Sequence, residues 1–440
     1  MSSGFDGGGF AGRRFAKLSA YLDSLGERYG IPACDLLIYK DHEQVYRHMA
    51  GFADLARTRP VSDSDLYFVY SATKIATCVA ALQLVERGLM PLSDPLCKYL
   101  PAFGDMRVDA SFDWGDIAGS LRNRRPKTRP ATGPILVRHL LAMTAGLTYN
   151  YLSDEIQDAV AGAGGGDGNG VERGASTARI AEAIARVPLA YEPGTRWMYS
   201  LAHDVLAAAI EAASGMKFSD YLAKNIWAPL GIESASFDPG GAAHGRLSQQ
   251  YRAVPAVPRG DEAALGGEAK DAESRGSGPR GGLETPGVNI VPIPAKNHLV
   301  LSPCHESGGA GLICTAGDYA LFADALCNRG IGRTGRRILG EKMTDEMRMD
   351  GLNGIQAKDF AMFNRKGYSY GLGVRTLVDA AFSKSPIGEF GWDGAAGAYA
   401  LMDADNRLCI FYAQHVLDYG KVYSEIHPAI RDLAYEALWA

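Results

Sequence analysis

Patterns typical of β-strands lie near both ends of this chain, while helical patterns fill its middle. Residues 35–40 and 44–49 form a predicted hairpin, and residues 370–377, 397–402 and 408–414 are predicted strands near the C-terminus. Strands so far apart can share one sheet only if the segment between them folds as an insertion. The sequence therefore predicts an α+β fold: an antiparallel β-sheet built from N- and C-terminal segments and flanked by helices, with an inserted mostly helical domain.

The predicted domains follow from this arrangement. Residues 1–65 and 305–440 are expected to form a discontinuous sheet domain, and residues 66–304 a mostly helical domain. Flexible loops are expected near 161–170, which is rich in glycine, and near 253–296, where apolar periodicity vanishes. Helices are predicted at residues 15–29, 71–85, 137–141, 180–187, 201–213 and 428–438.

Charge and cysteine usage narrow the range of partners. The formal net charge is −5 without a basic stripe, so no nucleic-acid partner is expected. No stretch approaches the roughly 18 apolar residues of a membrane span, and no secretory signal is recognisable, so we expect no membrane partner and a cytoplasmic location. The seven scattered cysteines favour buried thiols in a reducing compartment. No histidine or cysteine spacing suits a metal, so neither metal nor cofactor is expected. The oligomeric state stays open.

Ser71 and Lys74 are three residues apart at the start of a predicted helix. Positions i and i+3 of a helix share a face, so the lysine amine can reach the serine hydroxyl. A free serine is a weak nucleophile that needs a base, and a lysine desolvated by apolar neighbours can lose its proton near neutral pH. The pair is thus a candidate nucleophile and base, although a lone S-x-x-K is more often a helix cap.

Two further stretches could complete such a site. Tyr199 lies between Pro193-Gly194 and a predicted helix, where its phenol is a candidate proton shuttle if Ser71 and Lys74 are nearby. Residues 391–397 (GWDGAAG) precede a predicted strand, and glycines this dense let a substrate approach a backbone N–H. Taken singly, the tyrosine is more often a half-buried anchor and the glycines a plain turn.

These stretches, in this order, resemble the serine β-lactamase and penicillin-binding-protein superfamily, especially class C β-lactamases and family VIII carboxylesterases. Ser71 and Lys74 match the family's S-x-x-K, and residues 139–147 (HLLAMTAGL) are similar to its H-L-L-x-H-T-S-G-L. Residues 193–200 (PGTRWMYS) resemble the segment with the family's catalytic tyrosine, and residues 309–322 resemble a later signature. Residues 392–394 (WDG) stand where the family has K-T-G, H-x-G or W-x-G. The likeness covers about residues 30–414, apart from the two loops, and implies the β-lactamase/transpeptidase-like fold.

The resemblance implies a role for each matching residue. Ser71 would form an acyl-enzyme, and Lys74 and Tyr199 would take its proton and later activate the deacylating water. The backbone N–H groups of Ser71 and Ala395 would form the oxyanion hole. Trp392, Asp393, Gly394 and Leu201 would contact the substrate, a small-molecule ester or amide. No cofactor or metal would be needed.

Departures from the β-lactamase pattern favour an esterase. Leu201 replaces an asparagine that hydrogen-bonds the substrate amide, while Trp392 and Asp393 replace the lysine and threonine of K-T-G. An aromatic side chain beside an acid is expected to repel the carboxylate of β-lactams and stem peptides, whereas neutral esters lose nothing. No G-x-S-x-G is present, which excludes the α/β-hydrolase nucleophile elbow.

The leading hypothesis is therefore a carboxylesterase that acts on small to medium acyl esters through Ser71. A β-lactamase, a D-amino-acid peptidase or an acyltransferase with the same Ser-Lys-Tyr site is the alternative. A non-catalytic binding or sensor module on this fold is a further alternative, although a pure binder has no need of the Lys–Tyr pair.

Overall fold

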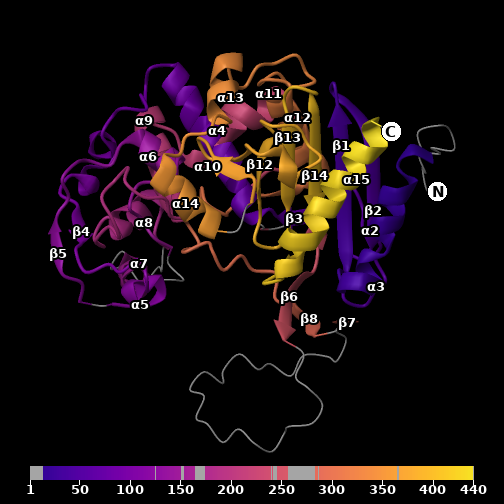
Figure 1. The fold of residues 1–440 in the computed structure, drawn as a ribbon, viewed down its shortest axis with the longest axis horizontal. Helices are drawn as coiled ribbons and strands as arrows, with labels where there is room; N and C mark the ends of the chain where they lie inside the picture. Colours follow the sequence, from indigo (N-terminus) through magenta and orange to yellow (C-terminus); the bar gives the residue numbers. More distant parts are fainter. Residues whose placement is uncertain are drawn as a thin grey trace, which may run out of the picture.

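The computed structural model describes residues 13–123, 125–149, 153–163, 174–238, 240, 245–255, 283–285, 287–363 and 366–439. Its centre is a seven-stranded antiparallel sheet in the order β10-β11-β12-β13-β14-β1-β2 (Figure 1). The strands are β1 (Ala33–Lys40), β2 (Glu43–Gly51), β10 (Tyr368–Tyr370), β11 (Arg375–Leu377), β12 (Phe390–Asp393), β13 (Tyr399–Asp403) and β14 (Leu408–Ala413). The predicted α+β fold, with one antiparallel sheet built from both ends of the chain, is confirmed.

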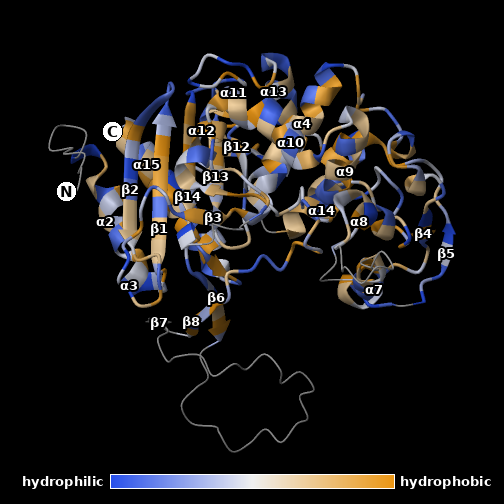
Figure 2. Cartoon of the chain, turned by 180° about the vertical axis from the view of Figure 1, so that it is seen from behind, coloured by the Kyte–Doolittle hydropathy of each residue, from blue (hydrophilic) through white to orange (hydrophobic). Residues whose placement is uncertain are grey.

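The pairing of β1 with β14 joins the two ends of the chain. Leu36 lies opposite Tyr412, and Leu37 lies opposite Phe411. Because side chains alternate along a strand, Leu37 and Phe411 enter the core on one face of the sheet while Leu36 and Tyr412 enter a second core on the other. Both faces are therefore buried, which explains why β1 is apolar along most of its length (Figure 2).

Helices cover both faces of the sheet. α12 (Ala316–Cys327) packs on β1, β13 and β14, and α4 (Thr73–Glu86) lies in the same core with almost every side chain buried. α15 (His427–Trp439) and α2 (Ala16–Asp23) contribute to the core on the opposite face (Figure 1). A helix buried on all sides is expected to be largely apolar, as α4 is apart from a few buried polar residues such as Lys74, Thr77 and Gln83.

Between β2 and β10 the chain is mostly helical. Its other helices are α5 (Ile117–Leu121), α6 (Val137–Leu141), α7 (Asp154–Ala163), α8 (Thr177–Ile184), α9 (Ala202–Ser214), α10 (Phe218–Leu222), α11 (Ala228–Leu230), α13 (Glu341–Met347) and α14 (Gly354–Met362). Short strands pair here as β3 (Leu66–Phe68) with β9 (Ile313–Thr315) and β4 (Arg107–Asp109) with β5 (Thr128–Pro130). The predicted helices α4, α6, α8, α9 and α15 are confirmed, with ends displaced by up to three residues.

Two predicted elements are wrong in detail. Residues 370–377 are not one strand: β10 and β11 pair as a hairpin, and Gly373 in the turn between them has a φ of +94°. The glycines at 371 and 373 were the signal for this turn. The helix predicted at 15–29 is divided at Ser24 into α2 and α3 (Leu25–Tyr29).

The segment 253–296 also differs from the predicted flexible loop at its two ends. β6 (Gln250–Pro255) and β7 (Leu283–Thr285) both pair with β8 (Val288–Ile293), and β15 (Val416–Leu417) pairs with β6. The strand-forming residues of 288–293 were the missed signal. Residues 256–282 and 286 lie outside the described residues.

Of the loop predicted near 161–170, residues 161–163 end α7, and the others lie outside the described residues.

The division into residues 1–65 with 305–440 and residues 66–304 stays a prediction. Among the described residues, no helix is both long enough and apolar enough to span a membrane.

Candidate active site

Ser71 lies where strand β3 turns into helix α4. The residue before it, Tyr70, has a φ of +46°, in the left-handed region that bulky residues seldom adopt. The Tyr70 hydroxyl is hydrogen-bonded to the side-chain amide of Gln250, which fixes this strained turn. Ser71 consequently stands at the N-terminus of a 14-residue helix, where the positive end of the helix dipole stabilises a developing negative charge.

The Lys74 amine lies inside the protein, one helical turn from Ser71. Its Nζ atom is 3.3 Å from Ser71 Oγ, 3.3 Å from Tyr149 Oη and 2.6 Å from the carbonyl oxygen of Gly309. Burial lowers the pKa of Lys74 to about 8, although the carboxylate of Asp204 acts in the opposite direction. Lys74 can therefore change between ammonium and amine near neutral pH, as a general base must.

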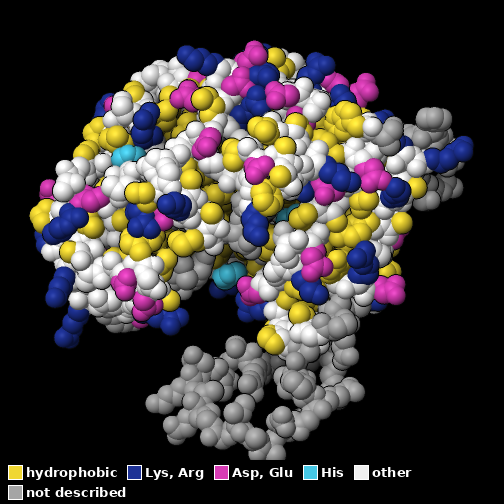
Figure 3. Space-filling model, in the orientation of Figure 1, with side chains coloured by type: hydrophobic (Ala, Val, Ile, Leu, Met, Phe, Trp, Pro, Cys, Tyr) yellow, Lys and Arg dark blue, Asp and Glu magenta, His cyan; other side chains and the backbone are white. Residues whose placement is uncertain are grey.

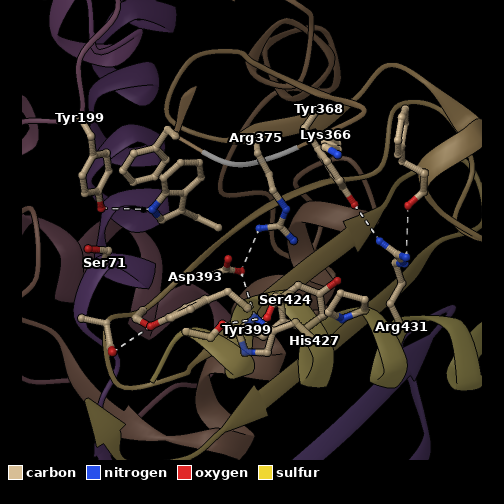
Figure 4. A pocket seen from close by; sticks show the side chains of 18 residues that line it. Ser71, Tyr199, Lys366, Tyr368, Arg375, Asp393, Tyr399, Ser424, His427 and Arg431 are labelled. Atoms are coloured by element: carbon tan, nitrogen blue, oxygen red, sulfur yellow. Dashed lines mark hydrogen bonds and ion pairs between the residues drawn. The ribbon is translucent and has the colours of Figure 1, made fainter. Parts of the chain in front are cut away.

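The Tyr199 phenol lies beside Ser71 (Figure 4), and Lys74 Nζ is 4.7 Å from the centre of its ring. Trp392 Nε1 donates a hydrogen bond to Tyr199 Oη at 3.2 Å, and the nearby Ser71 hydroxyl also lowers the pKa of the phenol. Burial raises the pKa of Tyr199 well above its usual value, and these two neighbours offset only part of that effect. The phenol thus stays protonated at neutral pH, which favours Tyr199 as a proton relay and Lys74 as the base.

Residues 139–147 hold residues 193–200, the segment that ends in the active-site tyrosine. The carbonyl oxygen of Met143 accepts a hydrogen bond from the Met198 N–H at 3.0 Å. Two more backbone bonds of 2.8 Å, accepted by the carbonyls of residues 144 and 146, fix the chain before it. The 139–147 motif therefore acts as a support for the site, and its departures from the family pattern leave these backbone bonds intact.

Gly146 in this support allows a mutational test. It has a φ of +84°, and a Cβ atom there would lie 2.4 Å from the carbonyl oxygen of Tyr191. Gly146→Ala is expected to lower the free energy of unfolding by about 2–4 kcal/mol, measured by urea unfolding. The matched control is Gly88→Ala, because Gly88 has a φ of +70° with no atom within 4 Å of the added Cβ. Only the backbone penalty of about 1 kcal/mol is expected there, and equal losses would contradict the packing argument.

The glycine-rich turn after β12 forms the wall opposite the lysine. A side chain on Gly394 would meet the Val69 carbonyl oxygen at 2.2 Å, so this turn lies directly against the segment that leads to Ser71. The Tyr423 hydroxyl is 2.9 Å and 2.8 Å from the carbonyl oxygens of Gly394 and Ala395 and orients both peptide groups. In the described part of the chain no hydrogen bond uses the Ala395 N–H, which suits it to an oxyanion.

A cavity of about 720 Å³ opens over these groups (Figure 4). Aromatic rings form much of its wall, and Trp392 stacks on Tyr199 with ring centres 5.6 Å apart. Leu201 is not brought to this cavity: it precedes α9 in the core, and its side chain is 1% exposed. The other predicted residues, apart from the buried Lys74, line it together: Ser71, Tyr199, Trp392, Asp393, Gly394 and Ala395.

Asp393 does not face the cavity as an uncompensated anion. Arg375 Nη1 donates a hydrogen bond to its carboxylate at 3.2 Å, and His427 Nδ1 lies 3.8 Å away. Lys366, Arg375 and Arg431 also line the cavity, so basic side chains outnumber the acid there (Figure 4). The expected repulsion of carboxylates by Asp393 is therefore not supported by its surroundings, and that part of the charge argument now depends on Trp392 alone.

Four contributors to the site were not predicted from the sequence. Tyr149 and the Gly309 carbonyl hold Lys74, Tyr423 holds the oxyanion turn, and Arg375 neutralises Asp393. Gly309 opens the 309–322 signature, and Tyr149 follows the 139–147 motif by two residues, so both had a weak signal. The other two lie in segments whose pattern indicates only secondary structure.

On the face drawn in Figure 3, basic and acidic side chains are intermixed. Among the described residues, no group of three or more His, Cys, Asp or Glu side chains could hold a metal ion. The groups positioned to act on a substrate in the cavity are the serine, the lysine, the tyrosine and the backbone N–H donors.

Comparison with known proteins points to the same chemistry. A family model described as Beta-lactamase matches residues 18–435. The chain is 26% identical to an esterase, EstB of Burkholderia gladioli, over 96% of this chain and 95% of that one. It is 23% identical to the acyltransferase calJ of Penicillium decumbens, over 93% and 92% of the two chains. The solved structure of EstCE1, a hydrolase with promiscuous acyltransferase activity, superposes with a TM-score of 0.70 at 23% identity and covers 97% of this chain and 100% of that one.

Proposed function

Given that the chain belongs to the Beta-lactamase family and is a serine hydrolase, we propose that it is a carboxylesterase acting on small to medium acyl esters. The observation that carries this proposal is Trp392, which lines the cavity beside the nucleophile and hydrogen-bonds Tyr199. An aromatic side chain at this position offers an apolar contact to an ester and no cation to a β-lactam carboxylate. The substrate partner proposed here is accordingly a small-molecule ester.

The proposed reaction begins with acylation. Ser71 Oγ attacks the ester carbonyl carbon as its proton passes to the neutral Lys74 amine 3.3 Å away. The oxyanion accepts hydrogen bonds from the N–H groups of Ser71 and Ala395. When the carbon–oxygen bond to the alcohol breaks, the leaving oxygen receives the proton through Tyr199, which leaves acyl-Ser71 and a neutral lysine.

Deacylation repeats the same proton transfers with water. A water molecule attacks the acyl carbon, and its proton passes to Lys74. The bond to Ser71 Oγ then breaks, the serine recovers its proton, and the carboxylic acid leaves. The side chains and N–H donors of the site can therefore carry out every proton transfer in both steps.

The proposal is tested by comparing two substrates. We expect p-nitrophenyl butyrate to be hydrolysed at neutral pH with a kcat/KM about 10- to 150-fold above that for a chromogenic cephalosporin, because a carboxylate that loses its hydrogen-bonded or paired partner costs about 1.5–3 kcal/mol. Equal or greater turnover of the cephalosporin would contradict the esterase assignment and favour a β-lactamase.

A pH profile tests the role of Lys74. Because the pKa of Lys74 lies at about 8 and the neutral amine is the reactive form, kcat/KM should rise with pH through about 8 and then level off. Below that pH the neutral fraction, and with it kcat/KM, should fall about tenfold per pH unit. The measurement is initial rates at low substrate concentration between pH 5.5 and 9.5, corrected for spontaneous ester hydrolysis. A profile that is flat from pH 6 to 9 would contradict Lys74 as the base.

Acyl transfer is the second candidate, and the size of the cavity favours it. About 720 Å³ exceeds what a butyryl group needs, so an alcohol acceptor has room beside the acyl-enzyme. Adding a primary alcohol to the p-nitrophenyl butyrate assay should yield the corresponding butyrate ester if transfer competes with hydrolysis. Product analysis that finds only butyric acid at high alcohol concentration would exclude it.

We also propose a cytoplasmic location, supported by cysteines that are all free in the structure. Fractionation of the source cells tests this, and recovery of the protein outside the cytoplasm would contradict it.

A further inference from the structure

Behind Lys74, on the side away from the cavity, a carboxylate is buried in the protein. Asp204, in the first turn of α9, is 2% exposed. Its Oδ1 atom accepts a hydrogen bond from Ser307 Oγ at 2.5 Å and another from the Gly309 N–H at 3.2 Å. Within the described residues its Oδ2 atom has no hydrogen-bond partner. A carboxylate buried with so few donors is costly unless a positive charge lies close by.

The same loop links this carboxylate to the lysine. The peptide N–H of Gly309 faces Asp204, and the carbonyl oxygen of Gly309 accepts the 2.6 Å hydrogen bond from Lys74 Nζ. The loop is held against the carboxylate: Thr77 Oγ1 donates to the Gly308 carbonyl at 2.7 Å, and a side chain at Gly309 would overlap Asp204. Asp204 therefore fixes the acceptor that holds Lys74 in line with Ser71.

The other titratable groups around Lys74 carry no negative charge at neutral pH. Burial lowers the pKa of His203 to about 3. His305 Nε2 lies 3.5 Å from Asp204 Oδ1, but burial lowers the pKa of His305 as well, so both imidazoles are neutral. Burial raises the pKa of Cys78, one turn further along α4, so its thiol stays protonated. The phenol of Tyr149 accepts a hydrogen bond from Lys74, and Lys74 Nζ lies 4.7 Å from the centre of the Tyr199 ring. Asp204 supplies the one carboxylate among these groups.

We propose that Asp204 is a positioning residue whose buried charge sets the pH at which Lys74 becomes a base. The assignment rests on the proposed function of Lys74 and Ser71 and goes beyond it. A carboxylate stabilises the ammonium form of a neighbouring lysine, so removing the charge makes Lys74 lose its proton at lower pH. A residue that only supports the loop would change the rate without moving this midpoint.

The test measures the rate at which a fluorophosphonate labels Ser71 between pH 5.5 and 10, which requires no ester substrate. In Asp204→Asn, whose amide keeps the acceptor for Ser307 and Gly309, the midpoint of the profile should fall by about one pH unit relative to wild type. Below the midpoint the labelling rate relative to its plateau should consequently rise about tenfold. The matched control, Ser307→Ala, loses the 2.5 Å hydrogen bond but keeps the carboxylate, and its midpoint should match wild type.

An unchanged midpoint in Asp204→Asn overturns the proposal. If that variant fails to fold, Asp204→Ser, a second neutral variant, takes its place, and failure of both to fold assigns Asp204 to structure alone and also overturns it. The esterase proposal fails separately: a shifted labelling midpoint without butyrate hydrolysis in wild type would keep the role of Asp204 and reject the substrate class. Butyrate hydrolysis by wild type with an unshifted midpoint in Asp204→Asn would keep the esterase proposal and reject the role of Asp204.

Discussion

Replacing Ser71 by alanine is expected to lower kcat/KM for p-nitrophenyl butyrate by about 10⁴-fold or more. The substitution removes the oxygen that forms the acyl-enzyme and leaves only the oxyanion donors and the bound water to act on the ester. Initial rates at pH 8 with several micromolar enzyme would measure the residual activity. Mass spectrometry of wild type after brief mixing with the ester should also show a butyryl adduct on the peptide that contains Ser71.

Ser64→Ala is the matched control for this experiment. Ser64 is an exposed serine seven residues before the nucleophile and lies outside the cavity. Its replacement should leave kcat/KM within about twofold of wild type, as is usual for surface substitutions. Ester turnover that survives in Ser71→Ala, in protein whose circular dichroism matches wild type, would reject the nucleophile assignment.

Replacing Lys74 by arginine is expected to lower kcat by about 10²–10⁴-fold. Arginine keeps a positive charge at the site but cannot give up its proton at any pH at which the protein folds. The bulkier guanidinium must also fit where Lys74 is wholly buried against Tyr149 and Gly309. The loss of kcat should persist up to pH 9.5. An enzyme that needed only a positive charge at this position would keep its activity in Lys74→Arg.

The comparison for Lys74→Arg is Lys98→Arg. Lys98 is an exposed lysine that pairs with Asp94, four residues earlier in the chain, and its replacement should leave kcat unchanged. Thermal melting of both variants separates loss of chemistry from loss of folding. A Lys74→Arg enzyme that is folded and fully active would exclude the lysine as base and leave Tyr199 as the remaining candidate.

The sequence was sufficient for the sheet and the helices that have strong periodicity. The β1–β2 hairpin follows from two apolar runs separated by Asp41 and His42, whose φ values of +54° and +69° match a tight hairpin turn. The break between β10 and β11 was missed because a window of apolar residues outweighed the glycines within it. β8 was missed because a short strand beside a glycine- and proline-rich segment has little periodicity of its own.

The site was predictable where its residues belong to motifs with known chemistry, and not where a contact arises only from the packing of distant segments. Ser71, Lys74, Tyr199 and the glycine-rich turn can be found from residue type and spacing, and the structure brings them around one cavity. The Gly309 carbonyl acts through its position in the fold, which no residue type encodes. The surroundings of Asp393 depend on Arg375 from the neighbouring strand, so its charge could not be judged from the residues next to it.

The pairing of β1 with β14 has a consequence for how this protein is made. On the ribosome the N-terminal hairpin and the nucleophile helix emerge first, and at about 5–20 residues per second they wait roughly tens of seconds for residues 408–413. During that time the inner edge of β1 is an unpaired, apolar strand that favours aggregation. The segment that bears Ala395 is also synthesised late, so the proposed oxyanion hole is incomplete and the enzyme inactive until that segment has been made.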